Sequence, residues 1–149
     1  MATASDTGSW TEQALHRLAE AGHRSGGARR ELLTLMGAQH CALSALEIEE
    51  ALAGGPRRVS RASIYRILEE LEAIGLAQRV DVGSGITRFE AVRSDSDHHH
   101  HLVCDSCGQL QPFTDEGLER AIAKASEHVP LEVSEHEVVL HGTCASCLT

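Results

Sequence analysis

Two Cys-x-x-Cys pairs constrain this chain more than any other feature of its sequence. They are Cys104-Asp105-Ser106-Cys107 and Cys144-Ala145-Ser146-Cys147, with 36 residues between them. Four thiolates arranged as two pairs can close a tetrahedron around Zn²⁺. The alternatives are two disulfides or a redox dithiol, but a cytoplasmic chain rarely keeps disulfides and a redox motif would not have a twin. The spacing therefore favours a structural zinc site.

Metal-ligand residue types gather in the same part of the chain. Residues 93–149 hold seven of the ten histidines and four of the five cysteines, with 3 basic and 10 acidic residues. Residues 1–92 carry 10 arginines and 12 acidic residues, so their net charge is close to balance. An acidic segment rich in nitrogen and sulfur ligands is typical of metal binding. The contrast between the halves predicts two domains.

The chain has no apolar run near the roughly 20 residues that a membrane span needs. Its start, MATASDTGSWTEQ, lacks a basic region followed by an apolar stretch, which is the pattern of a secretory signal. We therefore expect a cytoplasmic protein without a membrane partner.

The first 92 residues have the element order of a winged helix-turn-helix domain. Apolar spacing predicts helices over 10–22 and 27–37. A third helix begins at Ser44, where Glu47 completes a capping box, and we expect it to bury Ala45, Ile48, Ala51 and Leu52. A fourth runs from Ser60 to Ile74, and Gly75 is placed to end it. Two β-rich runs around a Gly-Ser-Gly loop then predict a hairpin.

Residues 93–97 are short and polar and predict a hinge. Beyond them we expect short strands at 101–103 and 109–113, a helix at 115–128 and a last strand at 131–141. The predicted fold class is therefore α+β: a winged-helix DNA-binding domain at 1–92, then a small α/β domain at 98–149.

Arginines cluster where such a domain would read DNA. Between Ala53 and Leu68 there are four arginines and no acidic residue. A helix-turn-helix protein places the start of its recognition helix in the major groove, where arginine can contact guanine or phosphate. The alternative is a solvated face whose arginines pair with Glu69, Glu70 and Glu72. The candidate DNA contacts are Arg57, Arg58, Arg61, Ser63, Tyr65 and Arg66.

Four consecutive histidines, His98 to His101, follow the predicted hinge. In an extended chain, alternate side chains point to opposite faces. His98 and His100 would then face one way, and His99 and His101 the other. The run can therefore serve two separate metal sites, for which further ligand candidates are Glu90, Glu119 and His136.

The segments SRASIYRILEELEAIGLAQRV, FE, HHHHLVCDSCG and GTCASC together resemble the ferric uptake regulator family of metal-dependent repressors. That family includes zinc, manganese, nickel and peroxide sensors. The resemblance extends from about Ser44 to Cys147. It implies a winged-helix domain, a hinge and an α/β dimerisation domain. It also implies a Cys₄ zinc site at Cys104, Cys107, Cys144 and Cys147.

The resemblance also implies two further sites for divalent ions. A sensing site at the hinge would use Glu90, His99 and His101. In many members its further ligand is a histidine two residues before the helix cap, where this chain has Ala42, so His40 and Cys41 are the candidate replacements. A second site within the dimerisation domain would use His98, His100, Glu119 and His136.

Two family variants fit the sequence less well. Related zinc sensors often place Asp and Cys at wing positions that are Gln78 and Val92 here. Peroxide sensors usually carry Asp where this chain has Glu90.

The resemblance implies a homodimeric repressor that a divalent ion, zinc or iron, activates for binding to a duplex operator of metal-uptake or metal-homeostasis genes. An ion joining Glu90 to His99 and His101 would tie the two domains together and select the binding geometry. The alternatives are a peroxide-, manganese- or nickel-responsive member, a zinc-dependent hydrolase with Glu119 as base, and a zinc-stabilised interaction module. A hydrolase is disfavoured because the chain has no H-E-x-x-H motif. The arginine-rich helix start disfavours the interaction module.

Overall fold

The computed structural model describes residues 4–24, 26–39, 41–83, 85–93 and 98–148. The chain divides into two compact units, residues 1–97 and 98–149. Of the predicted hinge, Ser94 to Asp97 lie outside the described residues, as does His40. In the described part of the chain, no helix is long and apolar enough to cross a membrane.

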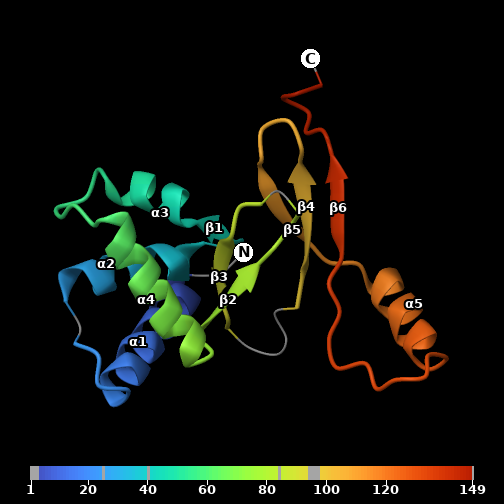
Figure 1. Cartoon of the computed structure of the whole chain (residues 1–149), viewed down its shortest axis with the longest axis horizontal. Coiled ribbons are helices and arrows are strands. Elements are labelled where there is room, and N and C mark those ends of the chain that lie inside the picture. Colours follow the sequence, from blue (N-terminus) through green and yellow to red (C-terminus); the bar gives the residue numbers. More distant parts are fainter. Residues whose placement is uncertain (1–3, 25, 40, 84, 94–97, 149) are drawn as a thin grey trace. The chain divides into compact units, whose positions relative to one another are not determined.

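The first unit is a set of helices with a small sheet at its edge (Figure 1). The sheet is antiparallel with strand order β1-β3-β2, so β2 and β3 form the predicted wing. Its elements are α1 (Ala4–Glu20), α2 (Gly27–Ala38), β1 (Leu43–Ser44), α3 (Ala45–Leu52), α4 (Arg61–Ala73), β2 (Ala77–Val80) and β3 (Arg88–Ala91).

Local signals in the sequence position α3 and α4. The Ser44 hydroxyl accepts a hydrogen bond from the Glu47 amide at 3.1 Å, and the Glu47 carboxylate accepts one from the Ser44 amide at 2.7 Å, which confirms the capping box. Ser60 caps α4 by accepting from the Ser63 amide. Gly75 has φ +76°, the left-handed conformation that ends the helix without a Cβ clash.

One apolar core fills the first unit. Ala14, Leu32, Leu33, Ile48, Ile64, Leu68 and Leu71 have no accessible surface, and Phe89 of β3 is 1% exposed. Fully burying one such large apolar side chain contributes about 1.5–3 kcal/mol. Ile64, Leu68 and Leu71 therefore anchor α4 in this core, and the opposite side of α4 lies in solvent.

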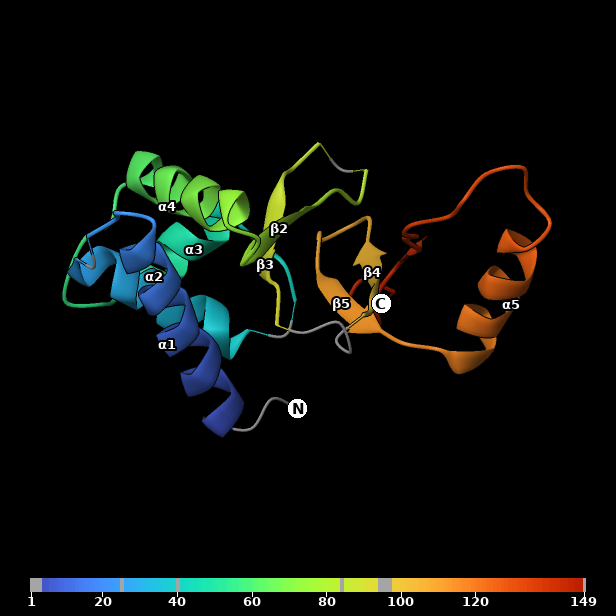
Figure 2. The same cartoon turned by 90° about the horizontal axis from the view of Figure 1, so that it is seen from below.

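The second unit is a three-stranded sheet with one helix (Figure 2). The strand order is β5-β4-β6, with β4 antiparallel to β5 and parallel to β6. Its elements are β4 (His100–Cys104), β5 (Leu110–Phe113), α5 (Glu116–Ser126) and β6 (Val139–Gly142). Among its described residues only His100, His101, Val103 and Cys104 are buried, and α5 buries none of its residues.

The fold class predicted from the sequence is confirmed, but several details were wrong. The first helix begins at Ala4 rather than at residue 10, and the short strand β1 was not predicted. Ala51 is exposed, because α3 turns only Ala45, Ile48 and Leu52 into the core. The last strand is confined to 139–142, since the residues from 131 to 138 form no ladder.

Candidate metal centres and DNA-reading helix

The four cysteines of the paired motifs lie together in the second unit. Parallel pairing of β4 with β6 puts Cys104 opposite Gly142, so the turn after each strand carries one Cys pair. Each cysteine contributes a sulfur, and these atoms all lie within 4.8 Å of one another. The Cys107 and Cys144 sulfurs are 3.8 Å apart. Zn–S bonds of about 2.3 Å in a tetrahedron require sulfurs about 3.8 Å apart, so the arrangement fits zinc.

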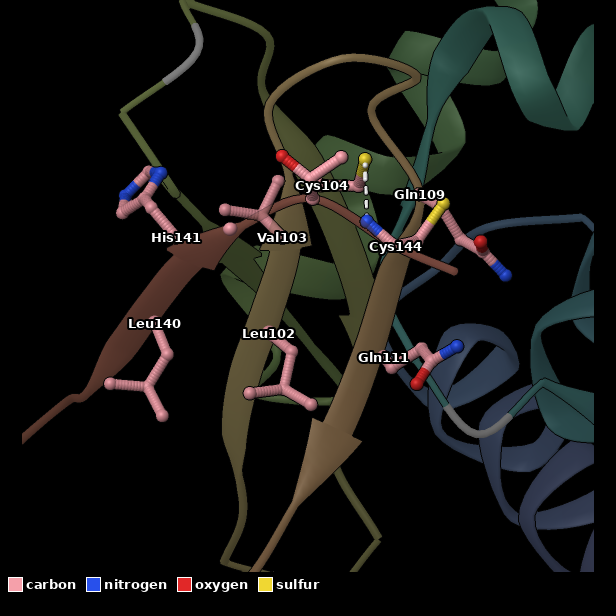
Figure 3. Close-up of a pocket in the computed structure, with 10 residues that line it drawn as sticks. Leu102, Val103, Cys104, Gln109, Gln111, Leu140, His141 and Cys144 are labelled. Atoms are coloured by element: carbon pink, nitrogen blue, oxygen red, sulfur yellow. Dashed lines mark hydrogen bonds between the residues drawn. The ribbon is translucent and has the colours of Figure 1, made fainter. Parts of the chain in front are cut away.

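Hydrogen bonds prepare one sulfur of this cluster for a cation. The Cys144 amide donates to the Cys104 sulfur at 3.3 Å, the bond drawn in Figure 3. This amide and that of Cys107 lower the pKa of the Cys104 thiol to about 6, because they stabilise its thiolate. A hydrogen bond between the Cys147 thiol and the Cys144 side chain favours the protonated form of Cys147 and raises its pKa to about 12. These amides therefore favour the thiolate form of Cys104, which is the form that binds a metal ion.

A second link between the two Cys turns was not predicted. His141 Nδ1 lies 2.9 Å from Asp105 Oδ1, and the Asp105 amide donates to the Gly142 carbonyl at 2.9 Å. Beside the cysteines is a hollow of about 230 Å³ whose lining includes Leu102, Leu140 and His141 (Figure 3). No spacing signal identified this pair, since Asp105 and His141 are 36 residues apart in the sequence.

His98 and His100 converge with Glu119 and His136 within the second unit. His100 Nε2 is 2.5 Å from Glu119 Oε1, His136 Nε2 is 2.8 Å from Glu119 Oε2, and His98 Nε2 is 3.2 Å from His136 Nε2. Glu119 projects from the first turn of α5, and His136 precedes β6. Hydrogen bonds from His100, and then His136, lower the pKa of Glu119. Three imidazoles and a carboxylate are a donor set suited to Zn²⁺, Fe²⁺ or Mn²⁺.

The buried histidine of this group is held by the backbone. His100 is 1% exposed, and its Nδ1 accepts a hydrogen bond from the Val138 amide at 3.2 Å. Together with the bond from the His101 amide to the Val138 carbonyl, this contact links β4 to the residue just before β6. No sequence pattern predicts this contact, because a backbone amide is common to almost every residue type.

The other two histidines of the run point to the opposite face. The rings of His99 and His101 are 5.0 Å apart, and His101 is buried. Glu90, the third expected ligand, belongs to the first unit, where it is 6% exposed on β3. Gln78 Nε2 donates to Glu90 Oε1 at 2.6 Å and fixes that carboxylate. The three residues are divided between the units, so their joint use remains a prediction.

Cys41 is the described candidate for a further ligand. Burial raises the pKa of its thiol to about 11, with Glu90 and Glu47 acting in the same direction. Cys41 and Glu90 both belong to the first unit. Cys41 therefore remains open as a ligand, but it would have to lose a firmly held proton.

The candidate DNA contacts lie on or just before the solvent side of α4. Arg61 is the first residue of α4, Tyr65 is 40% exposed, and Arg66 is exposed beside it. Ser63 is half-buried near the cap, while Arg57 and Arg58 are exposed in the preceding loop. These side chains therefore lie where a duplex could reach them, and their contact with DNA stays a prediction.

The alternative hypothesis was that these arginines pair with Glu69, Glu70 and Glu72. It is wrong for Glu70 and Glu72, which pair with other arginines. Glu70 pairs with Arg29 at 2.7 Å and Glu72 with Arg79 at 2.8 Å. Arg61 instead pairs with Glu49 of α3 at 2.7 Å. Arg57, Arg58 and Arg66 form no ion pair with a carboxylate of the described residues, so their charge is available to a polyanion.

The chain is similar in sequence to known metal-dependent regulators. The sequence profile of the ferric uptake regulator family matches residues 20–141. The chain is 34% identical over 105 residues to the ferric uptake regulation protein of Legionella pneumophila, covering 70% of this chain and 76% of that protein. It is 29% identical over 136 residues to the peroxide operon regulator of Bacillus subtilis, covering 91% and 92%.

A solved structure shares the fold over the whole chain. The ferric uptake regulator of Helicobacter pylori, described as having three functional metal-binding sites, superposes with a TM-score of 0.83 at 21% identity. The match covers 100% of this chain and 98% of that one.

Proposed function

Because the chain belongs to the ferric uptake regulator family of metal-responsive transcriptional regulators, we propose that it is a cytoplasmic homodimeric repressor of metal-uptake or metal-homeostasis genes. A divalent ion, zinc or iron, activates it for binding to a duplex operator. As a member of this family it is a transcriptional regulator and not an enzyme, which decides against the hydrolase hypothesis.

The observation that best supports this proposal is that alternate histidines of the run His98 to His101 belong to two different groups of possible metal ligands. His98 and His100 meet Glu119 and His136, whereas His99 and His101 lie side by side on the other face. The first set is complete within the second unit and supports its structure. The second set needs ligands from elsewhere, which is what a sensing site between two domains requires.

The proposed sensing site consists of His99, His101 and Glu90, with His40 or Cys41 as the open fourth ligand. Gln78 holds the Glu90 carboxylate on β3, so the wing presents one oriented oxygen ligand. A bound ion supplies the attraction that keeps carboxylate and imidazoles together. The chain's own part is to restrict the first unit to orientations in which two α4 helices of a dimer match two half-sites.

The structural site is proposed at Cys104, Cys107, Cys144 and Cys147, which would hold Zn²⁺. Coordinated thiolates there would crosslink the two turns that follow β4 and β6. A homodimer is supported by apolar side chains that the second unit leaves in solvent: Leu131 is 65% exposed, Leu140 51% and Leu148 73%. Burying such side chains against a second copy of the chain would remove apolar surface from water.

The choice of ion rests on ligand chemistry. Two imidazoles and a carboxylate suit several divalent ions, and a thiolate from Cys41 would favour zinc over iron or manganese. A peroxide-responsive role is the second candidate, because the Bacillus subtilis regulator matches 91% of the chain. Glu90 stands where such sensors usually have Asp, which speaks against that role.

Two single variants test the proposal. The wild type first enriches a duplex from a random pool in the presence of zinc or iron. We expect His99→Ala to lose metal-dependent binding to that duplex while keeping the Cys₄ zinc. His100→Ala should mainly shift the metal threshold or lower stability, because its partners lie within the second unit. Identical titration curves for both variants would contradict the division into two sites.

A further inference from the structure

Among the described residues, one carboxylate forms an ion pair with the arginine-rich surface, which consists of Arg57, Arg58, Arg61 and Arg66. Glu49 lies on α3, and its Oε2 accepts a hydrogen bond from Nε of Arg61, the first residue of α4, at 2.7 Å. Figure 2 shows α3 and α4 next to each other in the first unit. This pair joins the two helices at the end of α4 that would enter the major groove.

The bond to Glu49 involves only the Nε of the Arg61 guanidinium. Arginine has N–H donors on Nε and on both terminal nitrogens. With Nε engaged by Glu49, the terminal nitrogens of Arg61 have no hydrogen-bond partner in the described part of the chain. Two parallel donors at the end of the side chain match O6 and N7 of guanine, the commonest base-specific contact. A carboxylate behind the guanidinium reduces the orientational freedom that binding would otherwise remove.

Stability does not account for this pair. The side chains of Arg61 and Glu49 are 54% and 37% exposed. Ion pairs between such exposed side chains contribute little to stability. A carboxylate on a phosphate-facing surface also weakens attraction to any duplex. We propose that Glu49 is a positioning residue that orients Arg61 to read guanine, so that it lowers general DNA affinity while raising sequence preference.

The first unit contains a matched pair for comparison. Glu72 and Arg79 also bond through Nε, at 2.8 Å, with 36% and 47% exposure. Arg79, however, lies on β2 and stacks over the Phe89 ring at 5.0 Å. Breaking this pair removes an equivalent surface contact away from the surface formed by Arg57, Arg58, Arg61 and Arg66. Glu72→Ala is therefore the control for any general effect of removing a surface carboxylate.

The inference rests on the proposed DNA-binding function, and the experiment separates the two. Wild type, Glu49→Ala, Glu49→Gln, Arg61→Ala and Glu72→Ala each select from a random duplex pool with zinc or iron. Each protein then binds the duplex selected by wild type, and a scrambled duplex, in a titration. If the wild type enriches no sequence with either ion, the proposed function fails and the inference fails with it.

For Glu49→Ala we expect about fivefold or greater loss of preference for guanine at one position, within the range of a lost bidentate contact. Its affinity for the scrambled duplex should stay equal or rise. Glu49→Gln keeps an acceptor and should keep most of the preference, and Arg61→Ala should lose it. In the Arg61→Ala background, Glu49→Ala should have no further effect on preference, and Glu72→Ala should behave as wild type.

Two results would overturn the inference. Glu49→Ala could bind both duplexes more tightly by the same factor with its guanine preference unchanged, so that Glu49 only repels phosphate. Alternatively, Glu49→Ala could match Glu72→Ala in every measurement, which would make the pair an ordinary surface contact.

Discussion

Residues 4–93 enclose a continuous apolar core, whereas residues 98–148 bury few side chains, and two of the four are histidines. The helices show the same contrast. α4 buries Ile64, Ile67, Leu68 and Leu71, while α5 buries nothing. The first unit therefore has the usual hydrophobic source of stability. The second has clustered ligands instead: four cysteines, and three histidines around Glu119.

The difference follows from size. A unit of about 50 residues buries too small a share of its surface to be stable by apolar burial alone, and commonly needs metals, crosslinks or association. The second unit has ligand groups for the first of these, and exposed Leu131 and Leu148 for the last. Its fold and its metal response are therefore expected to be linked, while the first unit should fold without metal.

The largest effect should come from removing one sulfur of the Cys₄ cluster. Cys104→Ser should lose bound zinc and unfold the second unit, because a structural zinc supplies about 10–16 kcal/mol of apparent binding free energy to folding. Zinc analysis and two-dimensional NMR would show this, with resonances of the first unit unchanged. Ser106→Ala, in the same turn, is the control and should keep its zinc. A folded, zinc-containing Cys104→Ser protein would refute the assignment.

A substitution in the apolar core of the first unit should destabilise that unit and leave the zinc content of the second unit unchanged. Leu33 on α2 is fully buried, so Leu33→Ala should destabilise the first unit by about 2–5 kcal/mol. Zinc content should not change. Leu46 on α3 is 49% exposed, and Leu46→Ala should change stability by less than about 0.5 kcal/mol. Denaturant unfolding followed at Trp10, which is buried in this unit, measures both. Loss of zinc in Leu33→Ala would mean that the units do not fold independently.

The sequence predicted the first unit well where short-range signals decide the structure. Ser44 with Glu47, Ser60 and Gly75 are local signals of helix ends, and each acts as predicted. The cysteine cluster was also predictable, because paired ligands at close spacing carry their chemistry with them. By contrast, β1 has only two residues and exists because Leu43 pairs with Phe89, 46 positions later. No local pattern encodes such a pairing.

The details of the sites depended on long-range contacts of the same kind. Gln78 reaches Glu90 across the wing, the Val138 amide reaches His100, and His141 reaches Asp105. Each partner is an ordinary polar group whose role arises only from its position in the fold. The last strand was overpredicted for a related reason: alternating residues from 131 onward suit a strand, but only 139–142 have a neighbouring strand.

The cysteines offer a third test of the contrast, through their ionisation. Burial raises the pKa of Cys41 to about 11, whereas amide donors lower that of Cys104 to about 6. The pKa of Cys41 in the folded unit lies above its ordinary value of 9.0, so the folded unit holds this proton more tightly than the unfolded chain does. The proton therefore contributes fully to the stability of the folded unit at pH values below 9.0. This stabilisation is lost as the pH rises toward about 11.

In zinc-loaded protein, alkylation of Cys41 by iodoacetamide at pH 7.5 should be about a hundredfold slower than in the unfolded chain, in proportion to its thiolate fraction. The rate should rise about tenfold per pH unit, measured by mass spectrometry. Fast alkylation at neutral pH would mean an open thiolate at Cys41. Protection that survives at high pH, and disappears when the sensing site is emptied by mild chelation, would instead identify Cys41 as a ligand.

The smallest effect is expected from removing a helix cap, and it should differ between the two units although both caps use a side-chain oxygen. Asp115 Oδ1 accepts from the Leu118 amide at 2.7 Å, as Ser44 accepts from Glu47. Either cap replaced by alanine should cost about 0.5–2 kcal/mol. In Ser44→Ala the cost should appear as lower stability of the whole first unit, because α3 buries Ala45, Ile48 and Leu52. In Asp115→Ala it should appear only in α5, which no core holds.

Hydrogen exchange resolved by residue distinguishes these outcomes. Asp115→Ala should speed exchange of α5 amides by a few-fold to about thirtyfold and leave β4 unchanged, since local opening needs no global unfolding. Ser44→Ala should speed the slowest amides of α2 and α4 together. If Asp115→Ala also exposed the amides of β4, α5 would be coupled to the sheet through Glu119 and its histidines, or through a partner chain. Repeating the measurement in Glu119→Ala would decide between them: only coupling through the histidines depends on that carboxylate.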